Sequence, residues 1–192
     1  RRVKRKPTMT ETISPASLVL DAIRSPGVDN PSAFLATNSG NSVFTVPGRP
    51  GAIVYRTAGA YLVQLGGVFA PLDVQDALLQ AFVEFAAAQQ RTIVSIQLQR
   101  DDADRYAAHG FTVNQVGASY AVDLAEFTLR GTRFMQLRNK ISRAERAGLT
   151  VVEADADEWF DRMRQLDQVW LKSKGEHTRE LEFLVGQYGG EM

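Results

Sequence analysis

Apolar residues recur at two different spacings along the chain, which predicts a mixture of helices and strands. Apolar positions three or four residues apart predict helices at about 15–23, 73–90, 133–147 and 157–171, and a short one at 102–109. Short apolar runs bounded by glycine or proline predict strands at 42–46, 52–57, 60–65, 92–98, 111–116, 119–124, 149–153 and around 181–185.

The order of these elements predicts an α+β fold, in which a mixed sheet is flanked by helices. Residues 10–128 carry a strand meander, a helix, a strand, a short helix and two further strands, and we expect them to form one domain. Residues 129–192 begin again with a helix, a strand and a helix. Since a strand near residue 183 needs a partner, we expect this second stretch to be the incomplete start of a second, similar domain.

Composition narrows the class of protein. The chain has 192 residues, of which 44% are hydrophobic, and no cysteine. This excludes a disordered chain, a disulfide framework and a thiolate nucleophile. With only two histidines, and with Asp101, Asp102 and Asp104 lacking the glycine and glutamate of a calcium loop, we expect no metal site. No apolar run reaches membrane-spanning length and no secretory signal is visible, so a cytoplasmic protein is expected.

Charge is balanced in total but not along the chain. The 22 basic and 22 acidic residues separate into a tail with five basic residues in positions 1–6, a basic stretch at 130–146 and an acidic remainder. Met9 is a plausible natural start, so residues 1–9 are expected to be a tail without a role in the fold. The basic stretch coincides with the predicted helix at 133–147, and like-charge clustering of this kind favours phosphate-rich partners.

The second half of the sequence carries a recognisable series of motifs. Gly117 is followed by Val122-Asp123-Leu124, then by Phe127, Leu129 and Gly131, then by Leu137-Arg138 and a basic helix ending at Gly148. Trp170-Leu171, Lys172, Arg179-Glu180, Phe183 and Gly186 follow. This series resembles the C-terminal domain family of phosphatidylglycerol lysyltransferases, and the segments around Tyr61–Pro71 and Tyr106–Phe111 fit the first half of the same family.

The resemblance implies tandem acetyltransferase-like domains that use aminoacyl-tRNA as donor in place of acyl-CoA. The aminoacyl group would pass to a phosphatidylglycerol hydroxyl or to a small-molecule amine or hydroxyl. The chain contains no transmembrane region, so the lipid-directed alternative implies peripheral membrane contact through the basic face. A different class of protein, a non-catalytic module that binds RNA or protein, remains open.

Two groups of residues are candidates for the site. The basic helix would contact tRNA phosphates through Arg133, Arg138, Lys140, Arg143 and Arg146, although a solvated helix face has the same pattern. The segment 170–182 would line the acceptor end of the site. There Glu180, Glu182 and His177 are candidate bases or ligands of the donor's amino group, and Trp170, Lys172 and Arg179 are candidate acceptor contacts. Trp159 and Trp170 would equally fit a helix core.

No cofactor is expected. Acyl-CoA binding in this fold needs backbone N–H groups that cradle a pyrophosphate at a helix N-terminus. In this sequence the turn before the 73–90 helix contains Pro71, which has no N–H, and Asp73, which repels phosphate. Acyl-CoA is therefore disfavoured as a donor, and the absence of cysteine implies direct attack on a bound ester.

Overall fold

The chain folds into two compact units in the computed structural model, which describes residues 15–118, 120–153 and 156–175. The first unit comprises residues 1–113 and 174–192, and the second comprises residues 114–173.

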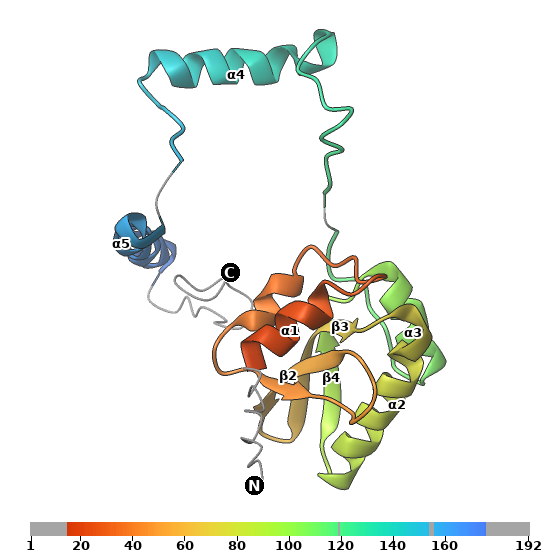
Figure 1. The fold of residues 1–192 in the computed structure, drawn as a ribbon. Coiled ribbons are helices and arrows are strands. Elements are labelled where there is room, and N and C mark those ends of the chain that lie inside the picture. The colour runs from red at the N-terminus through yellow and green to blue at the C-terminus, as the bar shows by residue number, and fades with distance from the viewer. Residues whose placement is uncertain (1–14, 119, 154–155, 176–192) are drawn as a thin grey trace, which may run out of the picture. The chain divides into compact units, whose positions relative to one another are not determined.

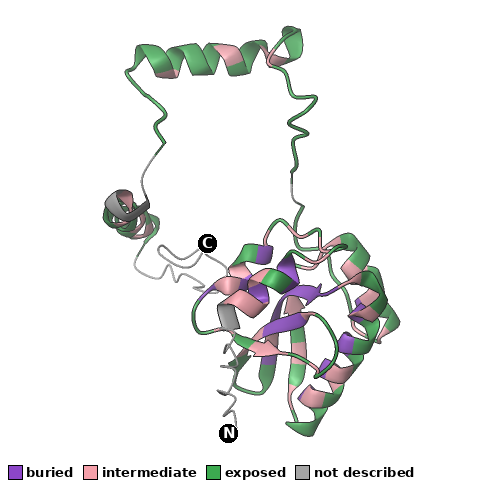
Figure 2. Ribbon diagram, viewed as in Figure 1, coloured by how far each residue is buried: buried purple, intermediate pink, exposed green. Residues whose placement is uncertain are grey.

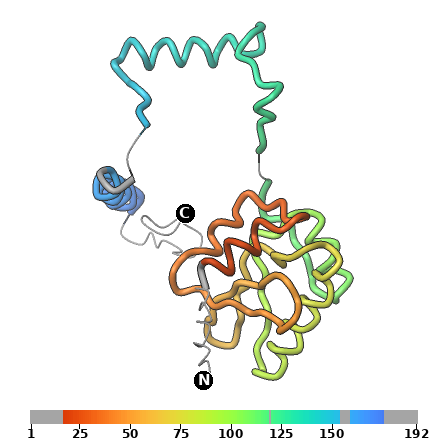
Figure 3. Tube along the Cα trace, viewed as in Figure 1, coloured from red at the N-terminus to blue at the C-terminus, as the bar shows by residue number. Residues whose placement is uncertain are grey.

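The first unit is built on a four-stranded mixed sheet (Figure 1). Strands β1 (Ser42–Phe44), β2 (Ala52–Ala58) and β3 (Tyr61–Phe69) form an antiparallel meander, and β4 (Thr92–Ile96) pairs with β3 in parallel. A parallel neighbour requires a crossover, which α2 (Leu72–Ala88) supplies between β3 and β4, as the trace in Figure 3 shows. Helix α3 (Arg100–Ala108) follows β4. The predicted α+β fold with a mixed sheet and flanking helices is confirmed.

Successive strand residues point to opposite faces of the sheet, and each face is covered by a helix. On one face, Ile53 and Leu62 pack against Leu78 and Phe82 of α2, and all four side chains are fully buried. On the other face, strand residues pack against α1 (Pro15–Ile23) and η1 (Ala33–Thr37). The period of apolar residues in α2 was sufficient to predict this helix to within a few residues.

Strand β3 contains an irregularity that changes its expected end. The pair Gly66-Gly67 was expected to terminate the strand, but β3 continues through it to Phe69. Val54 pairs with Leu65 while Ala52 pairs with Phe69, so β3 carries two extra residues opposite β2. Both glycines have positive φ angles, +72° and +88°, which a β-bulge of this kind requires.

The second unit contains helices but no strand among its described residues. It consists of η2 (Thr132–Phe134), α4 (Met135–Arg146) and α5 (Ala156–Lys174), the last of which ends one residue beyond the unit. The strands expected at 111–116, 119–124 and 149–153 are not formed in the described part of these segments. Strand propensity alone does not hold a strand, which needs a hydrogen-bonded neighbour. The strand expected around 181–185 lies outside the described residues.

Apolar side chains of the second unit are exposed. No described residue between 114 and 173 is buried, and the helices of this unit carry none of the buried colour in Figure 2. The side chains of Met163, Leu166 and Trp170 on α5 are 42%, 68% and 56% exposed. The helix core that Trp170 would fit is therefore not formed around this side chain in the described structure.

Candidate functional site: the basic helix α4

Helix α4 is amphipathic, and its sequence explains its limits. Phe134, Leu137, Ile141 and Ala144 recur three or four positions apart and form an apolar stripe. Gly148, with a φ angle of +80°, follows directly after the helix and adopts the left-handed conformation that commonly ends helices. Arg143 and Arg146 lie in the last turn, where positive charge interacts favourably with the helix dipole.

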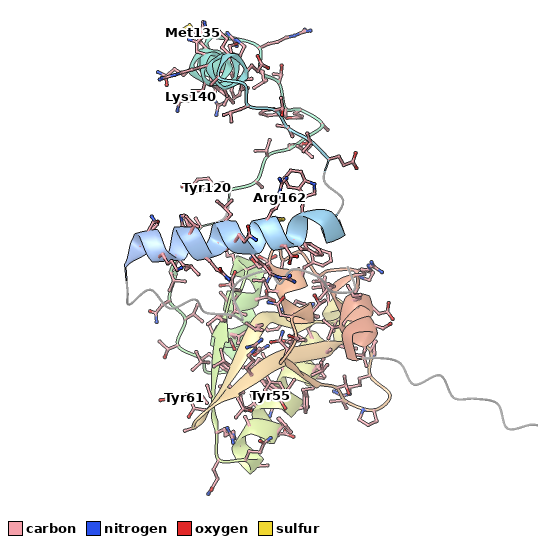
Figure 4. The ribbon with its side chains drawn as sticks, turned by 90° about the vertical axis from the view of Figure 1, so that its left-hand side faces the viewer. Tyr55, Tyr61, Tyr120, Met135, Lys140 and Arg162 are labelled. Atoms are coloured by element: carbon pink, nitrogen blue, oxygen red, sulfur yellow. The ribbon has the colours of Figure 1, made fainter. Side chains whose placement is uncertain are left out.

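The basic side chains of α4 occupy two different positions relative to the apolar stripe. At about 100° per residue, Arg143 and Arg146 lie on the side of the helix opposite the stripe, whereas Lys140 lies at its border. All three are exposed, and Glu145 is the helix's single acidic residue. Figure 4 shows the side chains of α4 spreading around the helix axis, with Met135 and Lys140 on different sides. The arrangement provides a strip of exposed positive charge.

Arg138 differs from the other basic residues of α4 because it contacts the loop that precedes the helix. Its Nη1 donates hydrogen bonds to the carbonyl oxygens of Leu129 and Gly131, the latter at 2.8 Å. Arg138 is also partly buried. Arg138 thus fixes the loop that leads into α4. The Arg133 guanidinium lies 5.6 Å from the centre of the Phe134 ring, at the edge of the stripe.

The second predicted group of site residues is described only in part. Trp170 and Lys172 lie on α5 and are both exposed. His177, Arg179, Glu180 and Glu182 lie outside the described residues, so their roles stay predictions. On the same helix the Arg162 guanidinium covers the Trp159 ring at 4.8 Å, a cation–π contact.

A buried polar cluster in the first unit was not predicted from the sequence. Gln64 of β3 is fully buried, and its Nε2 donates to the carbonyl oxygen of Gly67 at 2.8 Å and to the Tyr106 hydroxyl. Ser95 Oγ donates to Gln64 Oε1 at 2.9 Å. Burial raises the pKa of the Tyr106 phenol, so Tyr106 remains a neutral hydrogen-bonding group. The signal in the sequence that could have revealed this cluster is Gln64, a polar residue at a core position of a predicted strand.

Two further side chains fix the bulge at the carboxyl end of β3. Asn30 Nδ2 donates to the carbonyl oxygens of Gly66 and Gln97, at 3.1 and 2.8 Å, and so bridges β3 and the end of β4. The Asp102 carboxylate packs against Gly67, accepts the Gln99 N–H and pairs with Arg105 at 3.3 Å. Burial raises the pKa of Asp102 above its ordinary value. These contacts hold the bulge in place through side chains of the protein itself.

The start of α2 contains the residues that make the sequence unfavourable for binding acyl-CoA. The residue that precedes the helix is Pro71, no side chain caps this end, and Asp73 lies in the first turn. Gln75 is buried, and its Nε2 donates to the carbonyl oxygen of Ala70 at 2.7 Å, so a side chain of the protein occupies the turn.

Two other kinds of site are absent from the part of the chain that the structure describes. They contain no group of three or more histidine, aspartate or glutamate side chains placed to hold a metal ion. None of the helices in the described part of the chain has the length and apolar character needed to cross a membrane.

Comparison with known proteins identifies the family. The sequence model of the family described as "Phosphatidylglycerol lysyltransferase, C-terminal" matches residues 21–190. The phosphatidylglycerol lysyltransferase of Staphylococcus aureus is 22% identical over 151 residues, which cover 77% of this chain and 18% of the relative. The enzyme of the same name from Staphylococcus epidermidis is 25% identical over 139 residues, or 71% of this chain and 16% of the relative.

Solved structures share the fold. L-PGS from Bacillus licheniformis superposes with a TM-score of 0.68 at 23% identity, over 89% of this chain and 55% of the other. The C-terminal domain of a putative lysylphosphatidylglycerol synthetase from Agrobacterium fabrum gives a TM-score of 0.73 at 24% identity, over 91% and 55%. The chain thus spans less than a fifth of these curated relatives and about half of each solved chain. By the extent of the family match, the chain belongs to the family of phosphatidylglycerol lysyltransferase C-terminal domains.

Proposed function

We propose that this protein is an aminoacyltransferase that takes an aminoacyl group from aminoacyl-tRNA and passes it to a hydroxyl of phosphatidylglycerol. Membership of the family supports the reaction class and the lipid acceptor. The observation that supports aminoacyl-tRNA as the donor is the exposed pair Arg143 and Arg146, which lies on the side of α4 opposite its apolar stripe. A small-molecule amine or hydroxyl is the alternative acceptor.

The reaction needs few protein groups. The acceptor oxygen attacks the ester carbonyl of the aminoacyl group, a new C–O bond forms, and the bond to the tRNA ribose oxygen breaks. A base removes the acceptor's proton, and the ribose oxygen receives a proton as it leaves. We assign the base to Glu180, Glu182 or His177, and contacts with the acceptor to Trp170, Lys172 and Arg179.

Binding of tRNA would rest on phosphate contacts. Positively charged side chains along one helix face can follow a nucleic-acid backbone and position it without reading its sequence. Arg143 and Arg146 are the best placed for this role because both are exposed on the side away from the apolar stripe, whereas Arg138 is partly buried against two loop carbonyls and Arg133 lies against Phe134. Arg146 stays exposed although its Nε donates a hydrogen bond to the Ser142 carbonyl oxygen of its own helix at 3.2 Å. Lys140 lies between these arginines and the apolar stripe.

We further propose that no acyl-CoA takes part. Two features of the α2 start support this: Pro71 lacks an N–H, and the Asp73 carboxylate would repel a pyrophosphate. Direct transfer from a bound ester also fits a chain without cysteine.

Transfer of a radiolabelled amino acid from total aminoacyl-tRNA tests the proposal. Label should appear in phosphatidylglycerol when the full chain is supplied with that lipid, and less should appear with Glu180→Gln or Glu182→Gln. Glu126→Gln, a change at an exposed residue of the second unit, is the matched control and should leave transfer intact. Binding of tRNA without transfer to lipid or to small amines would instead support a non-catalytic RNA-binding module.

A further inference from the structure

Strand β4 has an edge without a partner. It lies at the end of the sheet order and pairs, among the described residues, with β3 alone. The Thr92 N–H points toward β3, where it donates to the Ala60 carbonyl oxygen at 2.9 Å. Since successive backbone groups of a strand point to opposite edges, the N–H and C=O groups of Ile93 and Ser95 face away from β3. They form a site where another strand can pair.

This edge lacks the features that normally keep an exposed strand from pairing. Natural proteins protect such edges with charged side chains, proline or a bulge. The residues of β4, Thr-Ile-Val-Ser-Ile, include no charge and no proline, and their register with β3 is continuous. The edge is therefore open to pairing, and the course of the chain after β4 indicates which segment can pair with it.

The connection after β4 directs the chain toward this edge. Helices α2 and α3 pack on the same face of the sheet, because Phe82 of α2 and Tyr106 of α3 belong to one buried cluster. Crossovers between parallel strands are right-handed in nearly all proteins. Two right-handed crossovers over one face move across a sheet in the same direction. Since the first one leads from β3 to β4, the second leads from β4 to its free edge.

Residues 111–116 have the anchor and the pattern of a strand at that position. The connection at 97–110 has the dozen or more residues that a parallel crossover needs. The Phe111 N–H donates to the Tyr106 carbonyl oxygen at 3.1 Å, and the centres of the two rings lie 5.1 Å apart. Phe111 and Ile93 pack against the same buried cluster, so they share a face of the sheet. The segment thus begins at a fixed residue, whereas residues 112–116 are exposed.

We propose that the outer edge of β4 binds residues 111–116, the strap, which closes onto it as a fifth, parallel strand. Val113 would then lie on the face of Phe111 and Ile93, and Asn114 on the face of Val94, because side chains alternate along a strand. The N–H of Asn114 would point toward β4 and that of Val113 away from it. The described structure holds the strap in its open position. Closure is independent of the proposed function, and it fixes the point at which the chain leaves the first unit for α4.

Amide hydrogen exchange of the full chain, resolved by residue with NMR, tests the closure. The N–H groups of Thr92, Val94 and Ile96 face β3 in either position of the strap, and they should be protected in both. Those of Ile93 and Ser95 gain acceptors only on closure, which should slow their exchange about tenfold or more relative to an unpaired edge. Exchange of Ile93 and Ser95 at the rate of unpaired amides, with the other three protected, would overturn the proposal.

Two neighbouring proline variants provide a matched pair. Proline has no N–H, so Asn114→Pro removes a hydrogen bond to β4, whereas Val113→Pro removes only an N–H that points away from β4. Asn114→Pro should therefore abolish the slow exchange of Ile93 and Ser95, and Val113→Pro should preserve it. Equal effects of the two variants, or no effect of either, would contradict the parallel pairing.

Cysteine pairs provide a second readout in a chain that has no cysteine of its own. Val94→Cys should form a disulfide within the chain with Thr112→Cys or Asn114→Cys, which share its face, and not with Val113→Cys, which points to the other face. Equal disulfide formation with all three would overturn the closure, because an unattached segment has no preferred face. A dimeric mass of the full chain, with Ile93 and Ser95 still protected in Asn114→Pro, would also overturn it by showing that a second copy occupies the edge.

Discussion

Substitution of Gly67 tests how tightly the bulge of β3 is held. Gly67 has a φ angle of +88°, and a Cβ atom built on it would lie 3.0 Å from Asp102 Oδ2. An alanine in this backbone conformation costs about 1–2 kcal/mol. The Asp102 carboxylate would also have to move away from the Gln99 N–H and Arg105, and a lost hydrogen bond to a charged group costs roughly 1.5–3 kcal/mol. Gly67→Ala should therefore lower the free energy of unfolding by about 2.5–5 kcal/mol.

Gly48 provides the matched control for this prediction. Its φ angle is +77°, and nothing lies within 4 Å of a Cβ built on it, so Gly48→Ala carries only the backbone cost of about 1–2 kcal/mol. Urea unfolding followed by far-UV circular dichroism measures both. In an Asp102→Ala background the additional cost of Gly67→Ala should disappear. Equal losses at Gly67 and Gly48, or an additional cost that persists without Asp102, would refute the reasoning.

Three further predictions concern the polar contacts. Tyr106→Phe removes a partner of buried Gln64 and should cost about 1–3 kcal/mol in urea unfolding, whereas Tyr61→Phe, at a side chain 49% exposed, should cost almost nothing. Burial raises the pKa of Asp102 above its ordinary 3.8, so ionisation of this carboxyl is less favourable in the folded state than in the unfolded state. The free energy of unfolding should therefore fall as the pH rises from about 3.8 through the raised pKa. Asp102→Asn should abolish this fall when unfolding is measured as a function of pH. Arg138→Ala should increase amide hydrogen exchange at the start of α4, because the carbonyl oxygens of the preceding loop lose their hydrogen-bond donor. Unchanged exchange would contradict the role of Arg138 in fixing this loop.

The elements that could be predicted from the sequence are those that local patterns determine. The apolar period of α2 and the glycine after α4 are properties of adjacent residues, and both predictions are confirmed. The Gly66-Gly67 pair is a turn signal by the same local rules, yet β2 pairs with β3 both before it, at Leu65, and after it, at Phe69, and the strand continues. Pairing between strands decides this point, and it is not a local property.

The same reason explains the missed strands and the missed cluster. The apolar residues at 119–124 and 149–153 have strand-like spacing, but no neighbour pairs with the described residues there. Gln64, Ser95 and Tyr106 are far apart in sequence and meet only because β3, β4 and α3 are adjacent. By contrast, the basic strip of α4 could be predicted because it lies on one helix. The second domain from residue 129 stays a prediction.

The central claim is that α4 binds the tRNA backbone, and the salt dependence of binding tests it most directly. Each phosphate contact contributes roughly 0.7–0.9 to the slope of log affinity against log salt concentration, so Arg143→Gln/Arg146→Gln should reduce this slope by roughly 1.4–1.8 in filter-binding assays with aminoacyl-tRNA. Arg24→Gln/Arg49→Gln, an equal charge change at exposed residues of the first unit, should leave the slope unchanged. An unchanged slope in the α4 variant, or an equal reduction in both variants, would contradict the account.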